Sequence, residues 1–181
     1  MSSPVVLSVN KSDVHNVSKQ PHPFIELIEG LGIEGDAHKG KTVQHGYLVR
    51  RDPERKNLRQ VHLIALEMIE EIKQKGFQIG AGSLGENITT QHIDLIHLPE
   101  GTILKIGEEA EIQLTGLRMP CSQLNKVQDG LMKAVLQFDE NKKPIPTCGV
   151  MSVILKGGKI YPNDSIQIVL PSGDHQPMKE V

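Results

Sequence analysis

Many short apolar segments make up this sequence, separated by glycines and prolines, and only one stretch keeps a helical spacing for several turns. Chains of this kind favour an antiparallel closed sheet with helices at its rim over alternating strand and helix units. We therefore predict a mainly β (α+β) fold, a closed β-barrel with a few peripheral helices. The strand-like segments are residues 5–9, 24–28, 149–155 and 160–170.

Residues 61–76 give the clearest helix prediction. Ile64, Met68, Ile69 and Ile72 recur at helical spacing, and Gly76 supplies a stop signal. A shorter helix is expected at residues 129–138, with Asp129 as its cap.

Glycine turns predict two hairpins. Residues 101–117 alternate around a Gly-Glu-Glu turn, which is typical of a hairpin. The dipeptide Gly157-Gly158 separates the last two apolar segments and tolerates the positive φ of a tight hairpin turn.

The length of 181 residues fits one domain with one hydrophobic core. We expect residues 1–181 to form a single domain, with the core at roughly residues 5–170. Residues 171–181 are polar, and we expect them to be a frayed tail.

The composition argues against several kinds of partner. The formal net charge is -2 and aromatic residues make up 3% of the chain, which argues against nucleic-acid binding. The chain lacks a basic, apolar leader and any apolar stretch long enough to span a membrane. We therefore expect a cytoplasmic protein that binds neither nucleic acid nor membrane.

Cys121 and Cys148 are the only cysteines, too few for a disulfide scaffold. Cys121 follows a predicted strand and ends the segment Arg118-Met119-Pro120-Cys121, where the guanidinium would favour the thiolate needed by a sulfur nucleophile or a metal ligand. A buried, inert thiol is the equally weighted alternative. Cys148 lies in a strand-like apolar stretch, which favours core packing.

A long glycine-punctuated loop at residues 32–59 carries Asp36, His38 and His45. These groups suit ligand binding or proton transfer, although their spacing matches no standard zinc signature, and loop bracing is the simpler alternative. The loop is also rich in lysine and arginine, which favours a small anionic ligand. Residues 82–87 (GSLGEN) add a second loop that permits close backbone approach but is no Walker or dinucleotide motif.

In combination, these segments resemble the MOSC domain family, named for the C-terminal domain of molybdenum-cofactor sulfurases. The resemblance runs from about Ile33 to Val169 and is similar to the small, stand-alone bacterial type. The motifs, in family order, are GIEGDAH, RQVHLIALE, GSLGENITT, the run ending in TGLRMPC, and VILKGGKIYPNDSIQIV.

The resemblance implies a β-barrel whose loops hold the pterin-based molybdenum cofactor. By motif position Cys121 is the reactive cysteine, which accepts sulfane sulfur as a persulfide or ligates molybdenum, and Arg118 is its catalytic neighbour. The matching polar positions assigned to cofactor binding are Asp36, His38, Arg59, Glu86 and Asn87.

The resemblance also implies partners and alternatives. The chain contains no fused desulfurase domain, so pyridoxal phosphate would belong to a separate cysteine desulfurase, with a molybdoenzyme as sulfur acceptor. The alternatives are a component of a reductase or detoxification system for N-hydroxylated compounds, and a non-catalytic cofactor-binding module. Asn163-Asp164 replaces the Gly-Asp of many members, a change expected to affect only a turn.

Overall fold

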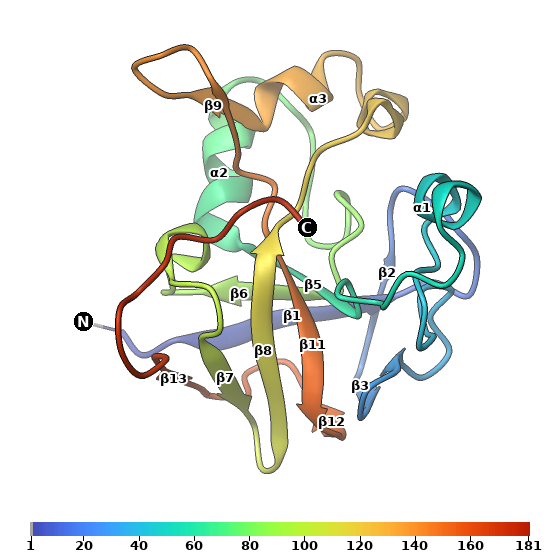
Figure 1. Ribbon diagram of the computed structural model, residues 1–181. Helices are drawn as coiled ribbons and strands as arrows, with labels where there is room; N and C mark the ends of the chain where they lie inside the picture. The colour runs from blue at the N-terminus through green and yellow to red at the C-terminus, as the bar shows by residue number, and fades with distance from the viewer. Residues whose placement is uncertain (1) are drawn as a thin grey trace.

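An eight-stranded sheet organises the structure, a computed structural model that describes residues 2–181 (Figure 1). All its neighbouring strands are antiparallel except the parallel pair β5 and β6. In spatial order the strands are β13 (Ile166–Val169), β7 (Ile103–Ile106), β8 (Ala110–Leu117), β11 (Val150–Lys156), β5 (Val61–Ala65), β6 (Ile88–Gln91), β1 (Val5–Lys11) and β2 (Gln20–His22).

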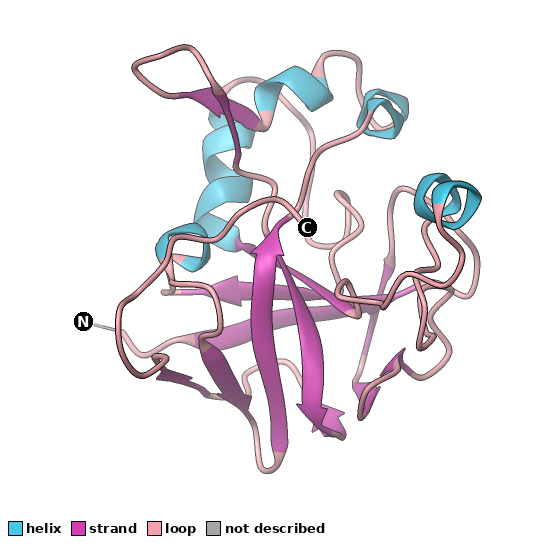
Figure 2. Ribbon diagram, viewed as in Figure 1, coloured by secondary structure: helices cyan, strands magenta, loops and turns pink. Residues whose placement is uncertain are grey.

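Two smaller sheets complete the β structure. One has the order β12 (Gly158–Ile160), β3 (Ile25–Ile28) and β4 (Gly32–Ile33), and the other pairs β9 (Leu136–Phe138) with β10 (Pro144–Pro146). Figure 2 shows most strands gathered in one half of the molecule, with the helices above and beside them.

The mainly β prediction is confirmed, but the expected closed barrel is not supported. Within residues 2–181 the main sheet has two ends, β13 and β2. Residues 4–6 exchange backbone hydrogen bonds with residues 163–166, around one isolated bridge between Val5 and Ser165, which lies just before β13. Asn163, at a φ of 73°, forms a turn just ahead of this bridge, and no continuous ladder within residues 2–181 closes the sheet.

Residues 2–181 contain three α-helices, α1 (Gly46–Arg51), α2 (Leu66–Gln74) and α3 (Leu131–Ala134), with 3-10 turns η1 (Leu95–His97) and η2 (Ser122–Lys126). The predicted helix at 61–76 therefore begins too early. Residues 61–65 are the strand β5, whose first four residues are buried between β11 and β6. Continuous apolar runs of this kind fit a buried strand as well as a helix. No helix within residues 2–181 is long and apolar enough to cross a membrane.

Two other local predictions need correction, while the 101–117 hairpin is confirmed as β7 and β8. The helix expected at 129–138 is only α3, because Gly130 caps it in the left-handed region and residues 136–138 pair as β9. Gly157-Gly158 is not a hairpin turn, since β11 pairs with β8 and β5 while β12 pairs with β3.

The C-terminal segment is ordered against the sheet, so the predicted frayed tail is wrong at its end. Met178 is buried in the main core, and the Leu117 backbone N–H donates to the Lys179 carbonyl at 2.8 Å. Glu180 forms a parallel bridge with Leu117. The chain therefore finishes beside the end of β8, where Figure 1 draws its C-terminus.

Two hydrophobic clusters support these elements. The larger joins side chains of the main sheet to side chains of β3, β4 and β12. The smaller packs against α2 and α3 and contains Cys148, Ile64 and Leu124. Since Val61 and Leu63 on β5 belong to the larger cluster and Ile64 to the smaller, this strand links both cores.

Candidate functional site

A cleft of about 1170 Å³ lies at one end of the main sheet. Segments distant in the sequence form its walls: residues 15–19, the loop and helix at 38–50, the start of β5, the loop before β6, residues 118–123 and the C-terminal Glu180 and Val181. Helix α1 has no buried residue, so one wall of the cleft is a helix that contributes little to the core.

Five of the seven predicted site residues line this cleft, and two do not. The lining includes Cys121, Arg118, His38, Arg59 and Asn87. Asp36 lies directly behind it, bonded to His38 and Asn87, and Glu86 lies in the interior.

Cys121 is exposed at the N-terminal end of η2, in extended backbone conformation. The segment that leads to it is anchored on both sides of Arg118. The Arg118 backbone N–H donates to the Gly149 carbonyl at 3.0 Å, and the Cys148 thiol donates to the Arg118 carbonyl at 3.0 Å. Cys148 is buried, and burial raises the pKa of its thiol. The two cysteines thus differ. The Cys121 thiol is exposed in the cleft, whereas the Cys148 thiol is buried and bonds to the backbone that leads to Cys121.

Arg59 and Arg118 present unused hydrogen-bond donors. Nε of Arg59 and Nη1 of Arg118 are buried and have no hydrogen-bond partner. Burial, and then the charge of Arg118, lowers the pKa of Arg59 to about 10, so the Arg59 guanidinium stays charged at neutral pH. Within residues 2–181 no acidic side chain pairs with either arginine. Half-buried cations without counter-ions favour an anionic ligand.

Asp36 connects several segments behind the wall of the cleft. Its Oδ2 accepts hydrogen bonds from Lys19 Nζ at 2.6 Å, Asn87 Nδ2 at 3.1 Å and the Ser12 N–H at 3.3 Å. Burial alone would raise the pKa of Asp36, but the hydrogen bonds from His38 and the charge of Lys19 outweigh it and hold the pKa well below its usual range. Asp36 is therefore an ionised brace between three parts of the chain.

Lys19, His45 and His62 also line the cleft. The sequence pointed to His45 as a loop residue suited to ligand binding or proton transfer, but to neither Lys19 nor His62. Burial, followed by the charges of Arg59 and other cations, lowers the pKa of His45 to about 2, and its Nδ1 has no partner. His62 is buried and lies 2.8 Å from the Cys148 carbonyl. His62 stands in the RQVHLIALE motif, which offered a signal. Lys19 lies in no motif, and only the fold brings it to Asp36.

Glu86 supports the second loop from within the protein. Its carboxylate accepts hydrogen bonds from the backbone N–H groups of Gly82 and Leu84 and from the Thr89 hydroxyl at 3.0 Å. Burial raises the pKa of Glu86. These bonds fix the turn between Gly82 and Gly85, which forms part of the cleft wall.

The cleft combines an exposed thiol, imidazoles and two unpaired guanidiniums, groups suited to sulfur chemistry beside an anion. Within the described residues, no group of three or more histidine, cysteine or acidic side chains is arranged to hold a metal ion. The charged side chains of the lining are mostly cationic, and Cys121 supplies its thiol.

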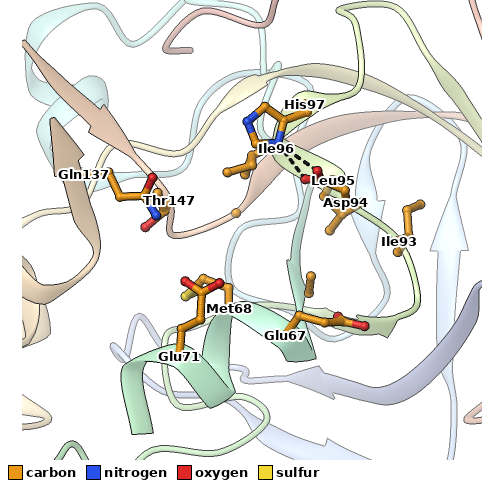
Figure 3. A pocket seen from close by; sticks show the side chains of 12 residues that line it. Glu67, Met68, Glu71, Ile93, Asp94, Leu95, Ile96, His97, Gln137 and Thr147 are labelled. Atoms are coloured by element: carbon orange, nitrogen blue, oxygen red, sulfur yellow. Dashed lines mark hydrogen bonds and ion pairs between the residues drawn. The ribbon is translucent and has the colours of Figure 1, made fainter. Parts of the chain in front are cut away.

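A second, smaller pocket of about 390 Å³ lies between the start of α2, η1 and β9 (Figure 3). It exposes Glu67, Glu71 and Asp94, and Asp94 bonds to His97 with both carboxylate oxygens, at 2.8 and 2.9 Å. Its acidic rim contrasts with the cationic cleft.

Comparison with known proteins gives both a family match and a fold match. The family model described as the MOSC domain matches residues 50–167. No curated protein matches the sequence significantly. YuaD of Bacillus subtilis has a similar structure, with 22% identity, a TM-score of 0.77, and coverage of 92% of this chain and 96% of YuaD.

YiiM proteins from two bacteria also share the fold. For YiiM of Geobacillus stearothermophilus the identity is 18% and the TM-score 0.66, covering 96% of this chain and 79% of that one. For YiiM of Escherichia coli the identity is 20% and the TM-score 0.64, covering 97% and 74%. At these identities the structural likeness shows the fold alone.

Proposed function

The chain belongs to the MOSC domain family. From this premise we propose that it is a molybdenum-cofactor-associated protein whose cleft binds the pterin-based cofactor. In this proposal the Cys121 thiolate accepts sulfane sulfur or ligates molybdenum. Arg59 and Arg118 bind the anionic part of the cofactor.

The two guanidiniums that line the cleft without an acidic partner among the described residues carry the proposal. An anionic ligand in the cleft would supply the missing counter-charge. Because Cys121 lies in the same cleft, a ligand held by the arginines would sit beside a thiol. Thiolate is a soft ligand, which suits a thiolate-binding metal.

The residues present therefore fit the cofactor. Arg59 and Arg118 would hold its charged group, Asn87 would lie along the same wall, and Cys121 would offer its sulfur. When bound, the cofactor supplies a redox-active metal. The chain's own residues orient it, neutralise its charge and present the thiol.

Sulfur transfer requires only a persulfide donor, such as a cysteine desulfurase. The Cys121 thiolate attacks the donor's outer sulfur, the donor's sulfur–sulfur bond breaks, and a new one forms on Cys121. The proton lost by the thiol is taken up by the donor's released thiolate. Arg118 would stabilise the negative charge on sulfur during this exchange.

The first test measures cofactor retention. Protein purified from a cofactor-replete host is analysed for molybdenum by mass spectrometry and for pterin by fluorescence after oxidation. Arg59→Gln and Arg118→Gln should each weaken retention about 10–100-fold, the loss of a charge-assisted hydrogen bond. Arg51→Gln is the matched control, because Arg51 is exposed and does not line the cleft. Wild-type protein free of both molybdenum and pterin would refute stable binding.

The second test measures persulfide formation. After incubation with a cysteine desulfurase and cysteine, intact-mass analysis should show one added sulfur atom on the wild type and none on Cys121→Ser. Cys148→Ser is the control, since the Cys148 thiol is buried. An equal gain on Cys121→Ser would show that Cys121 is not the acceptor.

A role in reducing N-hydroxylated compounds is the second candidate, because Cys121 is exposed in an open cleft. A strain lacking the protein should then grow less well than wild type on hydroxylated purines. Equal growth of the two strains would argue against this reductive role and leave cofactor binding and sulfur transfer as the candidate functions.

A further inference from the structure

Asp36 fixes the proton of His38 on one ring nitrogen. Asp36 Oδ1 accepts hydrogen bonds from the His38 backbone N–H at 3.0 Å and from the ring Nδ1 at 3.2 Å. An ionised carboxylate can only accept, so Nδ1 must carry the hydrogen. In the neutral ring Nε2 is then a bare acceptor.

The second nitrogen of His38 is open to the cleft. Within residues 2–181 nothing hydrogen-bonds to Nε2. This atom is also not one of the solvent-inaccessible side-chain atoms that lack a partner, so it is accessible. The ring packs between His15 and His45, with centroid distances of 4.9 and 4.5 Å, which fixes its orientation. Burial lowers the pKa of His38, so the ring is neutral at physiological pH.

The rest of the cleft offers mostly cationic donors. The charges of Lys19, Arg59 and Arg118 all lower the pKa of His45, whose ring centroid lies 4.5 Å from that of His38, so the acceptor lies near this positive group. The Nε2 atom of His62 lies 2.8 Å from the Cys148 carbonyl, so it is not a free acceptor for a ligand. A neutral acceptor beside cations suits a ligand that carries a donor near its negative charge.

We infer that His38 Nε2 is a specificity-determining acceptor that selects anions bearing an O–H or N–H donor, and that Asp36 is the positioning residue that fixes it. This rests on the proposed anion-binding role of the cleft. The donor is either the hydroxyl of a protonated phosphate or the N–H edge of a pterin-like ring.

Two matched ligand pairs separate these sources. Hydrogen phosphate and sulfate are similar in shape, but only phosphate carries a hydroxyl at neutral pH. Pterin-6-carboxylate and naphthalene-2-carboxylate are both bicyclic anions, but only the pterin has N–H donors. Binding is measured by calorimetry on the purified full chain.

The wild type should prefer the donor-bearing member of one pair by about tenfold, the effect of one neutral hydrogen bond. His38→Gln should erase this preference, because a glutamine amide rotates to donate or accept. Asp36→Asn should reduce it, and ring ¹⁵N spectra should show the hydrogen of His38 on Nδ1 in the wild type but shared between nitrogens in Asp36→Asn.

His97→Gln is the matched control, since His97 is also bonded to an aspartate through Nδ1 but lies in the other pocket (Figure 3). Equal binding of both members of each pair to the wild type, or a preference that survives His38→Gln, overturns the inference and leaves the proposed function standing. Failure of the wild type to bind any of the four anions overturns the proposed function and the inference together.

Discussion

Glu86 illustrates how one buried side chain supports the cleft without lining it. It satisfies two backbone donors and one hydroxyl of its own loop. We predict that Glu86→Ala lowers the free energy of unfolding by about 3 kcal/mol, because three buried donors lose their acceptor. Urea denaturation measures this value. Glu100→Ala, at an exposed glutamate, is the control, and equal stability of the two variants would contradict the prediction.

The buried histidines predict a loss of stability in mild acid. His45 and His62 have folded-state pKa values below the ordinary value of 6.5, so the unfolded chain binds more protons once the pH falls below about 6.5. Each should reduce the free energy of unfolding by up to about 1.4 kcal/mol per pH unit. Denaturation at pH 7 and 5.5 measures the loss, and a constant value would exclude it. Asp36 acts at lower pH. Because its folded-state pKa is lowered, ionised Asp36 stabilises the fold at any pH above the ordinary pKa of an aspartate, and this stabilisation is lost only in stronger acid.

The candidate site could be predicted from sequence where chemistry is local to a motif. Cys121 and Arg118 stand three residues apart after a strand, and both line the cleft. Lys19 could not be found this way, because its ion pair with Asp36 depends on how β2 and the loop after β4 meet. Glu86 was assigned to the cofactor because its motif is polar, but burial decides that it faces inward.

At the scale of elements, Gly116 on β8 allows the C-terminal segment to lie close to the sheet. A Cβ at this position would meet the Lys179 carbonyl and lie 2.8 Å from Cβ of Val181. We predict that Gly116→Val displaces residues 177–181, so that the amides of Leu117 and Val181 exchange hydrogen faster. Hydrogen-exchange mass spectrometry measures this change.

Gly80→Val is the matched control, because a Cβ at Gly80 meets nothing within 4 Å. The buried Met178 should also become accessible to oxidation in Gly116→Val alone. Unchanged exchange at the C-terminal segment would show that the sheet adapts to the larger side chain.

The fold was predictable where the alternation of apolar residues and the turn residues indicate the same element, as in the β7–β8 hairpin. It was not predictable at residues 61–65, where a continuous apolar run fits a strand or a helix until its neighbours are known. Parallel pairing of β5 with β6 depends on 22 intervening residues, and no local pattern encodes it.

At the scale of the whole molecule, charge is distributed unevenly. The formal net charge is -2, yet the cleft gathers unpaired arginines. We predict that pyrophosphate raises the melting temperature, with a stabilisation of about 2.7 kcal/mol at 100 times its Kd. The effect should weaken as ionic strength rises from about 0.01 to 1 M, where the screening length falls from about 30 to 3 Å.

The double variant Arg59→Gln/Arg118→Gln should lose this shift, while Arg51→Gln keeps it. Thermal denaturation at several salt concentrations decides the outcome. A shift that is equal in the wild type and the double variant would place pyrophosphate elsewhere on the surface.

The position of the last residues also affects how the protein should be handled. Glu180 and Val181 line the cleft, so an affinity peptide fused behind them would start beside the ligand site. Residues 4–6 instead bond to residues 163–166 at the β13 edge. A purification tag should therefore be fused at the N-terminus. If a protein tagged behind Val181 is purified without ligand, this does not show that the untagged protein lacks one.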